Sequence, residues 1–187
     1  MDNEQTVIAP DGATTIRIDG YLTELNLSDA LQQLTADHWL GNQVPVGDTR
    51  QRWDMAYRIG GTVTVVEYDG DEHYRHSIKI KADRAKDATA RSQGHRLVRF
   101  PYWVQLDDLT LKHYFGFEAK IEQSFPHGFI TTKLFPASFC ELGIERFRWE
   151  LLALPQNVRE AVISSLRQRA SEYGLQYVLP KALVDLI

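Results

Sequence analysis

The stretch from Thr62 to His73 reads TVTVVEYDGDEH and decides the fold. It opens with a β-branched run, which is typical of a strand buried inside a sheet. Four carboxylates then gather at the tip of the strand and in the following turn: Glu67, Asp69, Asp71 and Glu72. Acids at the end of an apolar strand lose hydration, and a divalent cation is the usual compensation. The stretch therefore predicts a central strand with a metal site at its end.

Composition limits the class of protein. The chain has 187 residues, 43% of them hydrophobic, which is enough for a single domain spanning 1–187 with one sizeable core. The single cysteine, Cys140, excludes a disulfide framework and a cysteine-based zinc site. No apolar run approaches ~18 residues and the start lacks a signal-peptide pattern, so we expect no membrane partner and a cytoplasmic location. The sequence leaves open whether the chain forms a homodimer.

Charge is distributed unevenly along the chain. The net charge of −4 argues against a general nucleic-acid binder. The segment directly after the acidic stretch is nevertheless basic, and it contains Arg75, Lys79, Lys81, Arg84, Lys86, Arg91, Arg96 and Arg99. A basic segment beside clustered acids suits a site that holds a metal and binds a polyanion next to it. An ordinary solvated helix face is the alternative interpretation.

Local patterns predict an α/β domain. We expect strands over 14–19, 52–57, 62–69 and 95–100, with Gly60-Gly61 as a hairpin turn. Expected helices run from an N-cap at Ser28 to about 38, from 79 or 82 to 92, from 107 or 108 to 115, and over 142–154 and 158–173. Residues 41–47 are expected to form a loop. The second helix is expected to turn Ala82, Ala85, Ala88 and Thr89 inward. This order predicts three layers around a small mixed sheet, followed by C-terminal helices.

The predicted strands bring a set of acids together. Asp54 would lie on the strand antiparallel to the one that carries Glu67 and Asp69. Metal-assisted phosphodiester hydrolysis needs carboxylates on a rigid frame, and the backbone carbonyl of Tyr68 could be a further ligand. His73, past the turn, could act as acid or base.

The basic segment supplies the candidate phosphate-binding residues Lys79, Lys81, Lys86 and Arg99. Arg99 could instead be a structural ion-pair partner of Asp54 or Glu67. The aromatic pair Tyr102-Trp103 favours core packing over base stacking.

Taken together, these pieces resemble the PD-(D/E)xK nuclease superfamily. They look most like the small endonuclease-like domains related to very-short-patch mismatch repair endonucleases. The resemblance rests on 53–57 (WDMAY), 65–73 (VVEYDGDEH), Lys86-Asp87 and 94–100 (GHRLVRF). It implies a restriction-endonuclease-like core over about 20–116. The mostly helical extension over about 117–187 has no counterpart in it.

The resemblance also implies roles for single residues. Asp54 would be the shared metal-binding aspartate, and Glu67 would occupy the acidic position of the (D/E)xK element. Asp69 stands where the superfamily usually has lysine, and His73 matches a histidine of the mismatch-repair relatives. A metal-binding acid on the first helix would be Asp29 or, as the other candidate, Glu24.

The function expected from this resemblance is a Mg²⁺-dependent DNA endonuclease, with Mn²⁺ as a substitute, in a repair, restriction or phage-related context. Asp54, Glu67, Asp69 and His73 would be its catalytic residues. The missing lysine and the negative net charge favour an alternative, a catalytically inactive module on a nuclease scaffold that binds nucleic acid or a partner. A third interpretation is a protein-interaction domain whose acidic tip touches no metal.

Overall fold

The computed structural model describes residues 14–124 and 136–187, and the predicted single domain includes 1–13 and 125–135, which lie outside that part. Its centre is a sheet of four strands, β2 (Trp39–Pro45), β3 (Arg52–Ile59), β4 (Thr62–Asp69) and β5 (Arg96–Pro101). The strands follow one another in the order β2-β3-β4-β5. The pairs β2/β3 and β3/β4 are antiparallel, whereas β4 and β5 are parallel. The mixed sheet predicted from the sequence is confirmed.

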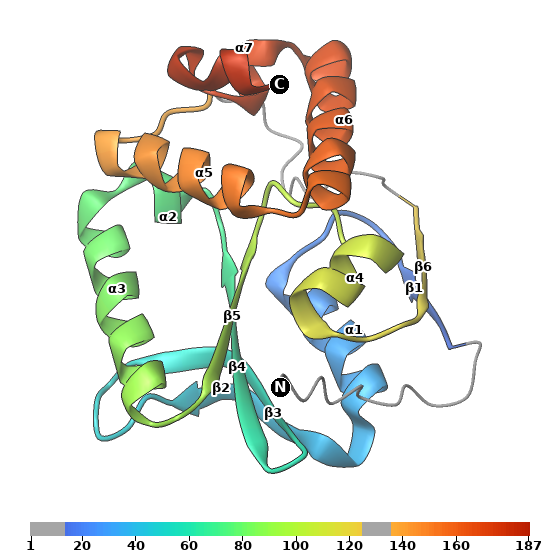
Figure 1. Ribbon diagram of the computed structural model, residues 1–187, viewed down its shortest axis with the longest axis vertical. Helices are drawn as coiled ribbons and strands as arrows, with labels where there is room; N and C mark the ends of the chain where they lie inside the picture. Colours follow the sequence, from blue (N-terminus) through green and yellow to red (C-terminus); the bar gives the residue numbers. More distant parts are fainter. Residues whose placement is uncertain (1–13, 125–135) are drawn as a thin grey trace.

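The two faces of the sheet pack against different helices because side chains alternate along each strand. Met55 and Val66 face the core that contains Leu31 of α1 (Glu24–Thr35). Val65 belongs instead to a smaller cluster with Ala90 of α3 (Ser77–Ser92). Figure 1 shows the sheet with α3 and α1 on opposite sides.

Shorter elements complete the described part of the chain. A 3₁₀ turn (Ala36–His38) follows α1, the single-turn helix α2 (Glu72–Arg75) follows β4, and α4 (Asp108–Phe115) follows β5. Strands β1 (Thr15–Ile18) and β6 (Lys120–Gln123) form a separate parallel pair. The C-terminal part contains α5 (Glu141–Ala153), α6 (Gln156–Tyr173), α7 (Leu175–Val178) and a 3₁₀ helix (Lys181–Leu186).

Most predicted elements lie where the sequence placed them. The hairpin turn at Gly60-Gly61 is confirmed, and both glycines adopt positive φ values of 57° and 82°. The third helix is confirmed with Asp107 as its N-cap, whose side chain accepts from the Thr110 amide. The two long C-terminal helices are also confirmed, and Pro155 separates them. Tyr102 and Trp103 are buried, as core packing requires.

The prediction for the first helix was wrong at its start. Thr23, not Ser28, is the N-cap, because Thr23 and Asn26 form a reciprocal capping box in which Asn26 takes the place usually filled by glutamate. Ser28 lies inside the helix, and its hydroxyl donates to the Asn42 side chain at 2.7 Å. Asn42 belongs to β2, so the expected loop over 41–47 is largely a strand. That strand was missed because none of its side chains is buried, so its sequence lacks the alternation of apolar and polar residues that marks a strand.

The inner face predicted for α3 was also wrong. Ala85 and Ala88 are exposed, whereas Ile80, Asp83 and Ala90 are buried. Charged side chains face the sheet here because charged partners on β4 and β5 meet them, as described below. Helix amphipathicity alone does not reveal such a face, since polar residues normally mark the solvent side.

The C-terminal helices share the main core with the sheet. Phe147 and Leu151 of α5 are buried in the same cluster as Phe100 of β5. Figure 1 shows α5 crossing above the end of the sheet where β4 and β5 finish. Gly143 lets α5 approach α2 closely, because a Cβ at this position would lie 1.9 Å from the Tyr74 carbonyl oxygen.

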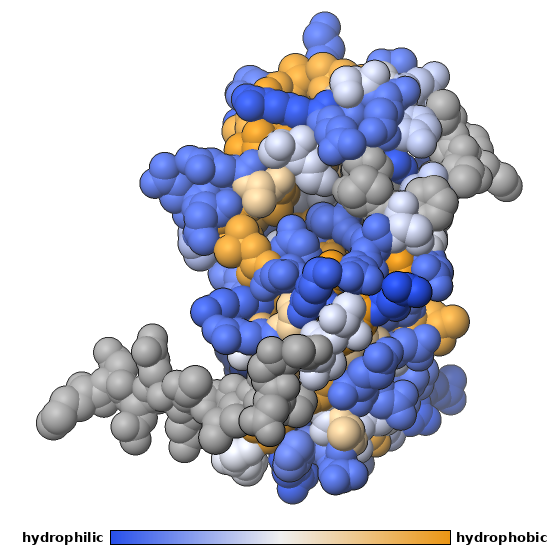
Figure 2. Space-filling model, turned by 90° about the vertical axis from the view of Figure 1, so that its right-hand side faces the viewer, coloured by the Kyte–Doolittle hydropathy of each residue, from blue (hydrophilic) through white to orange (hydrophobic). Residues whose placement is uncertain are grey.

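The outer surface is polar over large areas. The side that carries β6 and α6 is mainly hydrophilic, with smaller apolar patches (Figure 2). No helix in the described ranges is both long and apolar enough to cross a membrane.

The approach of α5 to α2 gives a testable prediction. Gly143→Ala should lower the free energy of unfolding by about 1–3 kcal/mol, because the new methyl group overlaps the Tyr74 backbone. Urea denaturation measures this change. Gly70→Ala is the control, since nothing lies within 4 Å of its added Cβ. A Gly143→Ala protein as stable as wild type would contradict the close approach.

Candidate active site

Asp54 and Glu67 meet where β3 and β4 stop pairing. The regular register ends at Met55 opposite Val66. Beyond that point the side chains replace the ladder, because the Asp54 amide donates to Glu67 Oε1 at 3.2 Å and the Tyr68 amide donates to Asp54 Oδ2 at 2.8 Å. The strands therefore hold the two carboxylates in fixed positions at their divergent end.

Lys86 of α3 brings a positive charge to this point. Its Nζ lies 2.5 Å from Glu67 Oε2 and donates to the Arg52 carbonyl at 2.7 Å. The ammonium also lies over the Trp53 ring, 5.2 Å from the ring centroid. Since only 12% of the side chain is exposed, these contacts fix the ammonium beside the two carboxylates.

A cavity of about 330 Å³ opens over this group. Asp54, Glu67, Tyr68 and Lys86 line it, together with His73. The first helix adds Glu24, which accepts a hydrogen bond from the Gln43 side chain at 3.1 Å. Asp29 is exposed and is not among the residues that line the cavity. Of the two acids considered on the first helix, the structure therefore brings Glu24 to the site.

The two acids have unusual protonation properties. Burial, with the nearby negative charge of Glu67, raises the pKa of Asp54 from 3.8 to about 7. Burial also raises the pKa of Glu67, against the opposing effect of Lys86. A positive charge bound beside these two carboxylates would favour their ionised forms.

Asp69 lies on the same strand face as Glu67 but in a different environment. Its side chain is fully buried. It accepts a hydrogen bond from Arg99 Nη1 at 2.8 Å and a short one from Arg146 Nη2 of α5. His73 Nδ1 lies 3.1 Å from Asp69 Oδ1, the oxygen that also accepts from Arg99. Asp69 is therefore part of an ion-pair cluster and does not line the Asp54 cavity.

Asp83 of α3 is the second acid of this cluster. Its Oδ2 lies 2.7 Å from His73 Nδ1 and 2.9 Å from Arg146 Nη1. Burial would raise the pKa of Asp83, but the contact with His73 and the charges of Arg99 and Arg146 lower it. These contacts fix the His73 ring between the cluster and the cavity, because His73 touches both.

One group of ligand atoms in the described ranges has the spacing of a metal site. Asp69, His73 and Asp83 each offer an atom within 4.8 Å of the others. Arg99 and Arg146 already neutralise its carboxylates. A cation would have to displace these guanidinium groups or be repelled by them, so the group is better suited to an ion-pair cluster.

The predicted phosphate-binding residues are separated by the fold. Lys79 lines the Asp54 cavity and lies 3.4 Å from Glu72, whereas Lys81 is exposed and does not line it. Arg99 is only 12% exposed and pairs with Asp69 and with Asp87 at 2.8 Å. Of the two ion-pair partners considered from the sequence, Glu67 lies within ion-pair distance of Arg99, at 3.9 Å, but Asp69 is the nearer partner.

Arg146 is the important residue that sequence reasoning did not identify. Arg146 lies in a helix that also contains several glutamates and another arginine, so nothing in the neighbouring sequence distinguishes it as buried. In the structure it contacts the Tyr74 ring, Glu150 and the His73 carbonyl as well as the two aspartates.

No protein-family model, curated protein or solved structure matches this chain. The geometry of the site therefore carries the functional interpretation.

Burial of Asp54 should make stability depend on pH. An acid whose pKa rises from 3.8 to about 7 on folding stabilises the folded state below about pH 4 and loses that effect as the pH rises through 7. Without metal, the free energy of unfolding of Asp54→Asn should therefore exceed that of wild type by about 1–3 kcal/mol at pH 8. At pH 4 the two proteins should be nearly equally stable. Urea denaturation in EDTA measures both.

The exposed Asp29 provides the matched control. Asp29→Asn should leave the stability nearly unchanged at both pH values. Adding Mg²⁺ at pH 8 should stabilise wild type and not Asp54→Asn. An Asp54→Asn protein less stable than wild type at pH 8 would contradict the burial argument.

The ion-pair cluster gives a second prediction. Arg146→Ala leaves Asp69 and Asp83 partly unpaired in a buried setting, which should cost about 3–5 kcal/mol of unfolding free energy. Arg167→Ala on the exposed surface of α6 should change it by less than about 0.5 kcal/mol. Equal losses in the two variants, measured by urea denaturation, would show that Arg146 does not stabilise the cluster.

Proposed function

We propose that this protein is a metal-dependent nuclease with a PD-(D/E)xK type of active site on a restriction-endonuclease-like core. The observation that carries the proposal is the convergence of Asp54, Glu67 and Lys86 in one cavity, at the divergent ends of β3 and β4. An aspartate, a second acid and a lysine are the residue types that the resemblance of the sequence calls for. DNA as the substrate follows from the same resemblance.

Asp54 and Glu67 fit Mg²⁺, or Mn²⁺ in its place, because hard cations prefer carboxylate oxygens. Mg²⁺ keeps several waters and needs only one or two protein carboxylates, so this pair is sufficient. The backbone carbonyl of Tyr68 and the carboxylate of Glu24 are further candidate ligands on the same cavity wall. When bound, the ion would lower the pKa of a water and offset charge on the phosphate.

Lys86 fills the role of the lysine that the superfamily usually has on this strand, where β4 carries Asp69. It reaches Glu67 from α3 rather than from two residues along the strand. From there its ammonium can hold the attacking water and the phosphate oxygen in place, since it is a compact donor with a fixed position. Lys79 at the cavity wall is the second candidate contact for phosphate.

His73 is the residue best suited to exchange a proton at the leaving oxygen. Its Nδ1 faces Asp83 and Asp69, at 2.7 Å and 3.1 Å. Those contacts orient the ring and leave its other nitrogen for substrate. In this proposal Asp69 acts through His73 as a positioning residue and does not touch the substrate.

The proposal predicts how single substitutions affect cleavage. Asp54→Ala and Glu67→Ala should each lower the rate of DNA cleavage in Mg²⁺ by at least about 100-fold, because the cation loses its ligand. Lys86→Met should lower it by a similar factor. The assay measures cleavage of plasmid, single-stranded and mismatched DNA.

Matched controls come from an exposed pair far from the cavity, Lys112 and Glu118. Lys112→Met and Glu118→Gln should cleave like wild type. Equal cleavage by wild type, Asp54→Ala and Glu67→Ala would refute the nuclease assignment. Salt-dependent DNA binding without cleavage in any metal would instead favour the inactive binding module.

A further inference from the structure

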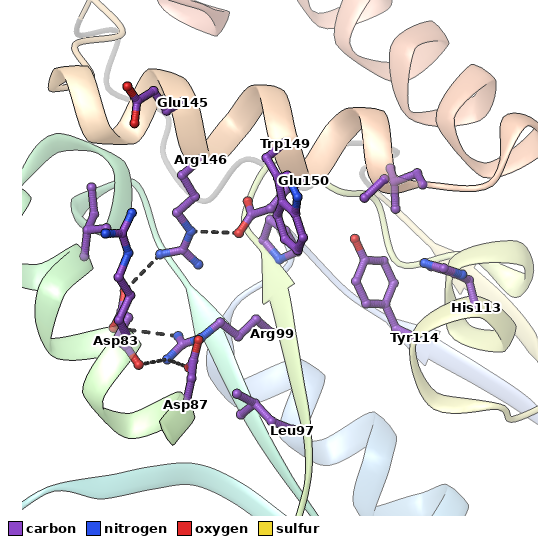
Figure 3. Close-up of a pocket in the computed structure, with 15 residues that line it drawn as sticks. Asp83, Asp87, Leu97, Arg99, His113, Tyr114, Glu145, Arg146, Trp149 and Glu150 are labelled. Carbon is purple, nitrogen blue, oxygen red and sulfur yellow. Dashed lines mark hydrogen bonds and ion pairs between the residues drawn. The ribbon is translucent and has the colours of Figure 1, made fainter. Parts of the chain in front are cut away.

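A second and larger cavity lies on the other side of α3. It has a volume of about 620 Å³, is open to solvent and is lined by residues of α3, β5, α4 and α5. Figure 3 shows Trp149 and Glu150 reaching into it from α5, with Tyr114 facing them and Arg99 and Asp87 beneath. Among the described residues, only Asp83 lines both this cavity and the Asp54 cavity. Volumes of about 300–1,000 Å³ are typical of small-molecule sites.

Part of the wall of this cavity is aromatic or aliphatic. Trp149 remains 72% exposed although it borders the cavity. Tyr114 is held in place because its ring packs on Phe100, with centroids 4.9 Å apart. Leu97 and Ile80 add aliphatic surface. Such walls suit a flat ring, because every nucleobase has a face that stacks on aromatic side chains.

The polar side chains beside the aromatic residues of this cavity are mostly uncharged or already paired. The Tyr114 hydroxyl makes no hydrogen bond with another residue of the described ranges, and burial raises its pKa, so it stays neutral. Burial lowers the pKa of His113, which favours its neutral form. Glu150 already accepts from Tyr74 and Arg146. Neutral groups that both donate and accept match the edge of a nucleobase.

The charges around the cavity leave one place at its edge for an anionic group. The acids Asp83, Asp87, Glu145 and Glu150 outnumber Arg84, Arg99 and Arg146 by one, so an anion can bind only at a guanidinium without a partner. Arg99 and Arg146 are occupied by ion pairs, whereas Arg84 is exposed and forms no ion pair within the described ranges. A phosphate at the rim would find its guanidinium available.

We propose that this cavity binds a nucleotide, with the base stacked on Trp149 and the phosphate at Arg84. The base could come from a free nucleotide or from an unpaired position in a strand. Neither source requires the chemistry of the Asp54 cavity, so the proposal stands apart from the proposed cleavage.

Calorimetric titration of the full chain with the common nucleoside monophosphates tests this site. We expect binding of at least one of them at millimolar concentration or below. Trp149→Ala should weaken it by about tenfold or more through loss of stacking. Leu152→Ala, also exposed on α5 but outside the cavity, should leave it unchanged. Arg84→Gln should weaken the monophosphate and not the corresponding nucleoside.

Two further arms separate the sources and the two proposals. If the base comes from a strand, a duplex with one unpaired base should bind more tightly than its fully paired or abasic counterpart. If only free nucleotides enter the cavity, the three duplexes should bind equally. Asp54→Ala should abolish cleavage and retain nucleotide binding. The proposal is overturned if no nucleotide binds at about 10 mM, or if Trp149→Ala binds like wild type.

Discussion

A carboxylate without access to water needs positive partners, and Asp69 is such a carboxylate. Arg99 from β5 and Arg146 from α5 meet this need, and each of them also contacts Asp83 of α3. One buried charge thereby ties together the tip of β4, its parallel neighbour, the helix over the sheet and the C-terminal extension. Without α5 the cluster would be left with an excess of negative charge, so the C-terminal extension is a structural part of the domain built on the central sheet.

The cluster also explains how a helix of one turn can hold His73 in a fixed position. Helix α2 is too short to be stable alone. Its carbonyl groups are fixed by α5, because Cys140 donates its amide to the Tyr74 carbonyl and Arg146 donates to the His73 carbonyl. Gly143 permits the backbones to approach this closely. The position of His73 is thus set from the C-terminal part of the chain, far away in sequence.

The sequence predicted the elements on which the site stands, because β4, its hairpin and the paired acids Asp54 and Glu67 all follow local rules of alternation and turn chemistry. It did not predict that Glu67 and Asp69, two residues apart on one strand face, would have different surroundings. That difference depends on Arg146, which comes from a helix 77 residues away in sequence. The wrong inner face of α3 has the same origin, since its buried Asp83 is explained only by partners on other elements.

The lysine shows most clearly why spacing along the chain is an incomplete guide. A catalytic ammonium must lie beside the second acid and near the reacting phosphate, and the element that supplies it is irrelevant to the chemistry. Position 69 could not supply it here, because that side chain points into the buried cluster. Lys86 reaches Glu67 from α3, and in the proposed function it takes the place of that lysine. Lys86 donates to Glu67, whereas within the described ranges the side chain of Asp54 accepts from the Tyr68 amide alone. In the proposed function a divalent cation would gain most from Asp54 and Glu24, because both line the cavity and neither accepts a hydrogen bond from Lys86.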